Sequence, residues 1–144
     1  MNKKKLVAVS EEDLLKAACA GNQGLFVLLV RELFRKPATP SRNEHIFAVV
    51  DTVARTGMSI AEFTLGKLHL EGIGTPKQVE LGRSLMLDAA RTDGRLYYDL
   101  GSQEWREGRA RQAQAFWKLG ARAGDSRCRR LLDDEPGETS PECN

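Results

Sequence analysis

Two histidines and a glycine-rich turn are the residues of this 144-residue chain whose types and spacing could support chemistry. His45 and His69 lie 24 residues apart, and no cysteine or further histidine stands at metal-ligand spacing from either, so a zinc-type site is not expected. Glu44 precedes His45, but adjacent residues of a helix point in different directions, so the two do not form an acid–base couple. The sequence therefore predicts no catalytic residue, no metal site and no cofactor.

The turn Gly-Ile-Gly at 72–74 has the composition of a phosphate-binding loop but not its context. Such loops follow a strand and open a helix, whereas here a helical pattern ends at the glycines and Thr75-Pro76 follows. Proline is favoured at the first position of a helix, so we interpret the segment as a turn between two helices. No nucleophile beside a base and no pair of carboxylates is recognisable, and an enzyme is the least favoured interpretation.

The properties of the whole chain indicate one soluble domain. A length of 144 residues suits a single core, and a formal net charge of +2 excludes a histone-like polycation. Three widely spaced cysteines argue against a disulfide framework. The basic opening is followed by too few apolar residues for a signal peptide, and no run reaches the roughly 20 apolar residues of a membrane span. We therefore expect a cytoplasmic protein without a membrane span.

Helical periodicity and helix-ending glycines run through most of the sequence. Ser10, with Asp13 three residues later, is typical of a helix start. Further helices are expected at about 25–36, 41–56, 59–72, 77–94, 95–108, 110–124 and 126–132. The expected domain organisation is a flexible N-terminus at 1–9, a helical-repeat domain at 10–132 and an acidic disordered tail at 133–144.

Short sequence elements recur at an offset of 36 residues. Thr39-Pro40 recurs as Thr75-Pro76, and the sequence Ala-Arg-Thr at 54–56 recurs at 90–92. Periods of roughly 30 to 45 residues with two helices each are typical of stacked helix hairpins. The predicted fold class is therefore an all-α solenoid of about four antiparallel hairpin units, the outer ones incomplete, without a sheet.

The segment AEFTLGKLHLEGIGT at 61–75 resembles a Sel1-like repeat, a relative of the tetratricopeptide repeat. The matching positions are Ala61, Leu65, Gly66, Gly72, Gly74, Ala89 and Ala90. KAACAGN at 16–22 is similar to the closing element of such a repeat, and Leu100-Gly101 to its opening. The resemblance implies a non-enzymatic scaffold or adaptor in bacterial signalling, secretion or envelope assembly, with no catalytic residues.

In a stack of such hairpins, the first helices line a concave side that can hold a segment of a protein partner. Here the first helices are those expected at 25–36, 59–72 and 95–108. Their outward residues mix aromatic side chains with arginines, which are enriched at binding hot spots. The candidate groove residues are Arg31, Phe34, Arg35, Phe63, Lys67, Leu70, Glu71, Tyr98, Ser102, Trp105 and Arg106.

The aromatic residues of this set have an alternative interpretation. Phe34, Phe63 and Tyr98 could pack between repeat units instead of facing a partner, because large apolar side chains dominate cores. Trp105 lies beside charged residues near a helix end and is expected to be exposed. Trp117 is expected to lie in the core.

Basic residues concentrate near the C-terminal end of the repeat domain. Between residues 101 and 130 there are eight basic residues against three acidic ones. The candidate basic face consists of Arg109, Arg111, Lys118, Arg122, Arg127, Arg129 and Arg130. It could be a solvated surface partly neutralised by the acidic tail, a surface for an acidic protein segment, or, less favoured, a nucleic-acid contact.

A homodimer is a further alternative for the protein as a whole, because the apolar segment at 25–30 could pack against a second copy.

Overall fold

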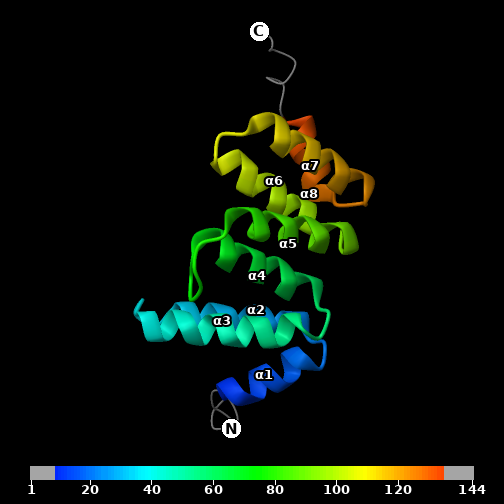
Figure 1. The fold of residues 1–144 in the computed structure, drawn as a ribbon. Coiled ribbons are helices and arrows are strands. Elements are labelled where there is room, and N and C mark those ends of the chain that lie inside the picture. Colours follow the sequence, from blue (N-terminus) through cyan, green and yellow to red (C-terminus); the bar gives the residue numbers. More distant parts are fainter. Residues whose placement is uncertain (1–8, 135–144) are drawn as a thin grey trace. The chain divides into compact units, whose positions relative to one another are not determined.

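A computed structural model of the chain describes residues 9–134, which form α-helices joined by short turns (Figure 1). The helices are α1 (Glu11–Cys19), α2 (Gln23–Phe34), α3 (Pro40–Ala54), α4 (Ser59–Glu71), α5 (Val79–Thr92), α6 (Leu96–Arg106), α7 (Ala110–Arg122) and α8 (Ser126–Asp133). No strand occurs among the described residues, so the predicted all-α fold class is confirmed. The chain divides into two compact units, unit 1 (Met1–Leu85) and unit 2 (Met86–Asn144), with the boundary inside α5.

Side-chain caps start several helices, and the predicted start at Ser10 is confirmed. The Ser10 hydroxyl accepts a hydrogen bond from the backbone N–H of Asp13 at 3.1 Å, and the Thr39 hydroxyl accepts one from the N–H of Arg42 at 3.0 Å. Pro40 is the first residue of α3. A backbone N–H at this position has no carbonyl acceptor within the helix, so its absence in proline loses no helical hydrogen bond. These caps satisfy backbone donors that have no partner inside the helix.

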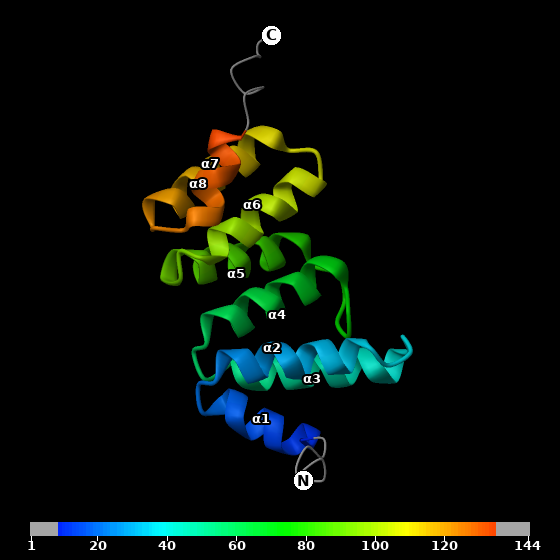
Figure 2. The same ribbon diagram turned by 180° about the vertical axis from the view of Figure 1, so that it is seen from behind.

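Unit 1 has one hydrophobic core, to which α1, α2, α3 and α4 all contribute. α2 and α3 lie side by side in both views (Figure 1, Figure 2). The expected buried residues of the third helix are confirmed, since Ile46, Val49, Val50 and Val53 are all at most 4% exposed. The apolar residues at helical spacing therefore pack against one another in the core of unit 1.

Unit 2 contains the end of α5 and the helices α6, α7 and α8. Trp117 of α7 is 3% exposed and shares a core cluster with Ala113 and with Cys128 of α8. Tyr97 of α6 stacks on Phe116 of α7, with ring centroids 6.2 Å apart. The prediction that Trp117 lies in the core is therefore confirmed.

The two ends of the expected domain organisation are only partly covered. Most of the expected flexible N-terminus and acidic tail, at 1–8 and 135–144, lies outside the described residues. Asp133, assigned to that tail, is the last residue of α8. Within residues 9–134, every helix is too short or too polar to cross a membrane.

Candidate protein-binding surfaces

Both histidines make contacts that tie helices of unit 1 together. The His45 imidazole pairs with the carboxylate of Glu11, which also lies 3.9 Å from the Lys36 ammonium. The His69 ring packs edge-on against Phe47, with centroids 5.3 Å apart. No group of three or more metal-ligating side chains occurs between residues 9 and 134. The histidines therefore link α3 to α1 and to α4.

The two Thr-Pro elements found by the repeat comparison meet in one open pocket of unit 1. The pocket has a volume of about 500 Å³ and is lined by Ala38, Thr39, Pro40, Asn43, Glu44, Gly72, Gly74, Thr75 and Pro76. Glu44 is the one ionisable side chain in this lining. A carboxylate repels phosphate, and a lone carboxylate provides no acid–base pair, so the lining supports neither phosphate binding nor catalysis.

On α2, the candidate groove residues are exposed as expected. Arg31, Phe34 and Arg35 all face solvent, and Phe34 is 36% exposed. The Arg42 guanidinium lies 5.1 Å from the centroid of the Phe34 ring and donates to the backbone carbonyls of Phe34 at 3.2 Å and Lys36 at 2.8 Å. Arg42 was not identified from the sequence, because its role depends on the end of α2 lying beside the start of α3.

On α4, the structure corrects the sequence prediction. Phe63 is 5% exposed and Leu70 is 7% exposed, so their assignment to a partner-binding surface is wrong. The physical reason is that α4 is covered on a second side by α5, where Gly82 packs directly against the backbone of Gly66 and Leu70. Lys67 is half-buried, and Glu71 at the end of the helix is exposed.

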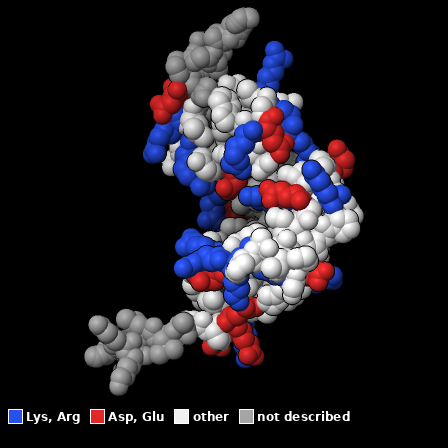
Figure 3. All heavy atoms as spheres, turned by 90° about the vertical axis from the view of Figure 1, so that its left-hand side faces the viewer, with Lys and Arg blue, Asp and Glu red and all other residues white. Residues whose placement is uncertain are grey.

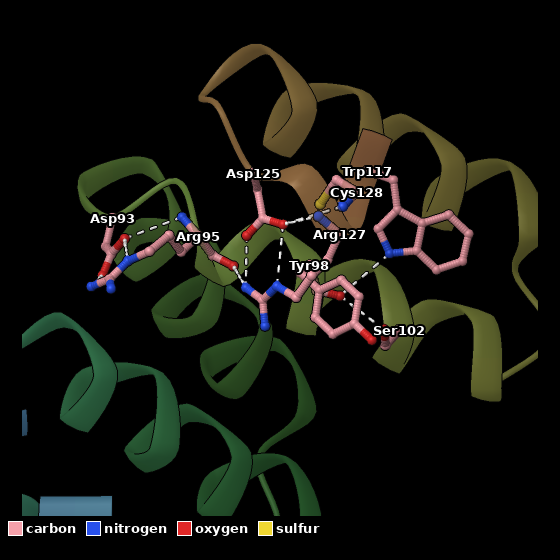
Figure 4. A network of polar contacts seen from close by, with 8 residues as sticks. All are labelled: Asp93, Arg95, Tyr98, Ser102, Trp117, Asp125, Arg127 and Cys128. Atoms are coloured by element: carbon pink, nitrogen blue, oxygen red, sulfur yellow. Dashed lines mark hydrogen bonds and ion pairs between the residues drawn. The ribbon is translucent and has the colours of Figure 1, made fainter. Parts of the chain in front are cut away.

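On α6, the candidate residues divide into supporting and exposed groups. Tyr98 is half-buried beneath the Arg127 guanidinium, 4.2 Å from its ring centroid, and its backbone carbonyl accepts hydrogen bonds from Ser102 and Trp117 (Figure 4). Trp105 is 46% exposed, which confirms the expectation for this residue. Its ring lies against that of Trp117, with centroids 5.7 Å apart.

A polar network fixes the end of α6 around Trp105. The Arg109 guanidinium pairs with the buried carboxylate of Glu104 at 2.5 Å and with Glu107. The side-chain amide of Gln103 donates to Glu107 at 2.5 Å and accepts from Arg106 at 3.0 Å. Buried polar groups that are fully paired rigidify their surroundings, so this helix end is a firm support for the exposed indole.

The same contacts correct part of the predicted basic face. Arg109 is committed to Glu104 and Glu107, and Arg127 is committed to Asp125 at 2.6 Å, so neither is a free cation. The hydrogen bond from Arg127 lowers the pKa of the Asp125 carboxyl, which also caps α8 by accepting from the N–H of Cys128. Spacing along the sequence did not show that these acids and arginines would pair.

The remaining candidates of the basic face are exposed. They are Arg111, Lys118 and Arg122 on α7, and Arg129 and Arg130 on α8. On the face seen in Figure 3, Lys and Arg side chains are interspersed with Asp and Glu and do not form one continuous basic area. The face drawn in Figure 3 therefore offers no continuous phosphate-binding surface of the kind that nucleic-acid binding requires.

The Cys128 thiol is expected to be unreactive in the folded protein. Cys128 is fully buried, and burial raises its pKa to about 11, which leaves little of the nucleophilic thiolate near pH 8. Cys19 is only partly buried. Alkylation with iodoacetamide at pH 8, followed by peptide mass mapping, should label Cys19 well before Cys128. Equal labelling of both thiols in the native protein would contradict this prediction. Labelling of Cys128 that needs prior denaturation in urea would agree with it.

Comparison with known proteins identifies the fold but not the function. No family model and no curated protein sequence matches the chain. Among solved structures, the chain is similar to a protective antigen present in uropathogenic Escherichia coli strains, whose crystal structure displays an SLR (Sel1-like repeat) fold. The TM-score is 0.60 at 20% identity, and the match covers 92% of this chain but only 29% of the antigen. This chain therefore has the fold of Sel1-like repeat proteins.

Proposed function

We propose that this chain is a non-enzymatic scaffold that binds a segment of another protein, with Trp105 on α6 as the main anchor. The observation that carries the proposal is the 46% exposure of Trp105, a large aromatic side chain that nevertheless rests on the buried Trp117. Exposed tryptophans on rigid supports bring a large contact area at a low cost in conformational entropy. The network around Glu104 and Arg109 provides that rigidity.

The candidate groove residues near Trp105 do not all face a partner: some are exposed, and others support the surface from below. Arg106 is exposed next to Trp105 and can reach a partner carboxylate, whereas Tyr98 and Ser102 support the surface from below. In unit 1, Arg31 and Phe34 on α2 and Arg35 at its C-cap offer a second contact surface, with Phe34 held under Arg42. A single groove over α2, α4 and α6 stays a prediction from the sequence.

The biological context of the proposal comes from the resemblance alone. Sel1-like repeats imply work in bacterial signalling, secretion or envelope assembly, and the similar structure is described as a protective antigen. The chain spans 29% of that structure, so the antigen's properties extend to this chain only as a proposal. Binding of nucleic acid is the alternative.

Replacing Trp105 by alanine is expected to weaken the partner complex while leaving the fold intact. Loss of a central aromatic anchor typically costs about 2 kcal/mol of binding, roughly thirtyfold in Kd. Partners would be captured from the native cells with tagged protein, with and without nuclease, and the affinity of each would then be measured by calorimetry. Leu81→Ala is the matched control, because Leu81 is a similarly exposed apolar residue at 42% on α5.

Three results would separate the hypotheses. A protein partner that survives nuclease, loses affinity with Trp105→Ala and keeps it with Leu81→Ala would support the scaffold function. Equal affinity of wild type and Trp105→Ala would exclude Trp105 as the anchor. Recovery that disappears under nuclease would make nucleic acid the leading hypothesis.

A further inference from the structure

One helix of unit 2 carries exposed cations that the fold does not neutralise. Arg111, Ala115, Lys118 and Arg122 recur at spacings of four, three and four residues, so they share one side of α7. All four are exposed. We call these four residues the α7 stripe. The stripe spans 12 residues, 111–122, or about 16 Å along the helix axis.

The α7 stripe differs from three other exposed helical cations of the described region, each of which has a carboxylate partner on its own helix. Lys16 pairs with Glu12, Arg55 with Asp51 and Arg91 with Asp88, in each case three or four residues away on the same helix. α7 contains no aspartate or glutamate at all. Among residues 9–134, no carboxylate is paired with any of the three stripe cations.

The stability of α7 explains Arg122, which lies in the last turn where the negative end of the helix dipole favours a cation, but it does not explain Arg111. Arg111 lies in the first turn of α7, where the positive end of the helix dipole disfavours a cation. An acid at that position, or at position 115 between the cations, would stabilise the helix better. The position of Arg111 is therefore unfavourable within residues 9–134 taken alone, and it becomes favourable where negative charge is supplied from outside them.

The middle of the stripe suits the close approach of another helix. Ala115 has a small side chain, and Leu119, one residue beyond Lys118, is 37% exposed although large and apolar. A small residue at a contact permits neighbouring helices to approach to about 8 Å. Cations near both ends with a small and an apolar residue between them make an amphipathic contact surface.

We propose that the α7 stripe docks an acidic amphipathic helix of a protein partner. Every α-helix has the same rise, so carboxylates at i, i+7 and i+11 of a partner helix can lie opposite Arg111, Lys118 and Arg122. A single-stranded nucleic acid fits less well, because the stripe has no aromatic side chain on which a base can stack. The inference rests on the proposed scaffold function but uses side chains of α7 rather than Trp105 of α6.

The test uses the full chain and a synthetic probe. The probe is a fluorescein-labelled peptide of about 18 residues, long enough to form a helix on binding, with Glu at i, i+7 and i+11 and Ala and Leu between. Fluorescence anisotropy at low salt is expected to show binding that weakens about tenfold in R111Q/K118Q/R122Q, the size expected from three partly exposed charge pairs. The control K16Q/R55Q/R91Q removes one Lys and two Arg elsewhere and is expected to bind as wild type.

A second variant tests the same idea without removing any cation. Ala115→Glu places a carboxylate four residues from Arg111 and three from Lys118, so it supplies the missing counter-charge within α7. Probe binding is expected to fall as in the triple variant, while the helicity measured by circular dichroism stays the same or rises. This variant keeps the test valid even if the triple variant folds poorly.

Three outcomes would overturn the proposal. The first is unchanged probe binding by A115E. The second is a loss of binding in the control K16Q/R55Q/R91Q as large as that in R111Q/K118Q/R122Q. The third is tighter binding of a single-stranded DNA oligonucleotide than of the peptide, with the DNA binding also lost in R111Q/K118Q/R122Q. Trp105→Ala is expected to bind the probe as wild type does. Failure of the α7 stripe therefore leaves the role of Trp105 to be judged by its own partner measurement.

Discussion

Gly74→Ala is expected to destabilise unit 1 by about 3–5 kcal/mol, the sum of left-handed backbone strain and a steric clash. Gly74 has φ +73°, and a Cβ at this position would lie 2.2 Å from the carbonyl oxygen of Asn43 and 2.8 Å from the Cβ of Phe47. The contacted oxygen belongs to the backbone of α3, which cannot move without disturbing the core. The turn after α4 would therefore have to leave its place against α3.

Gly57→Ala is the matched control for this prediction. Gly57 also has a left-handed backbone, with φ +94°, but an added Cβ would meet no atom within 4 Å. Its cost should therefore be the strain alone, about 1–2 kcal/mol. Urea unfolding followed by circular dichroism measures the free energy of unfolding of both variants. Circular dichroism is chosen because the helices of unit 1 contribute to its signal, whereas both tryptophans of the chain lie in unit 2. Equal losses for the two variants would show that the clash with Asn43 is absent.

Trp117→Ala is expected to destabilise unit 2 by about 3–5 kcal/mol, the usual range for truncating a buried aromatic residue. The substitution removes a side chain that is 3% exposed and its hydrogen bond to the carbonyl of Tyr98 at 3.3 Å. It also removes the surface on which Trp105 rests. Chemical unfolding followed by circular dichroism measures the loss, and a loss below about 1 kcal/mol would contradict the assignment of Trp117 to the core.

A double-mutant cycle with Gly101→Ala tests the packing around Trp117 directly. A Cβ at Gly101 would lie 2.4 Å from the indole nitrogen of Trp117, so Gly101→Ala alone should cost about 2–3 kcal/mol by overpacking. In the Trp117→Ala background the added methyl group enters the space left by the indole and should cost much less. Additive losses would mean that the two residues do not contact each other, because coupling between touching residues exceeds about 0.5 kcal/mol.

Local signals in the sequence were sufficient to predict the helices of the described region. A cap such as Ser10 and glycines after helix ends act over three or four residues, so their effect can be read without the tertiary structure. The cap at Thr39 and the place of Pro40 as the first residue of α3 were not predicted, although they are local features too. Helix limits shifted by two residues or so, as at α5, where the expected helix 77–94 is Val79–Thr92.

The candidate surfaces were predicted less completely. Trp105 was correctly expected to be exposed because charged neighbours near a helix end are a local feature. Phe63 and Leu70 were assigned to the surface because the sequence indicates which residues share one side of α4, but not how many neighbours the helix has. Ion pairing of Arg109 and Arg127 was missed because it depends on turn geometry at the ends of α6 and α7.

By itself, the sequence determined the all-α class, the repeating hairpins and the order of the helices, because periodicity, capping and helix-ending glycines are encoded within single helices and turns. Only the tertiary structure decided that α5 covers the second side of α4, that Arg42 holds Phe34 at the end of α2, and that Arg111, Lys118 and Arg122 remain without carboxylate partners among residues 9–134. The physical reason is that burial and charge pairing depend on which helices lie within contact distance, and that distance is set by packing between segments remote in the sequence.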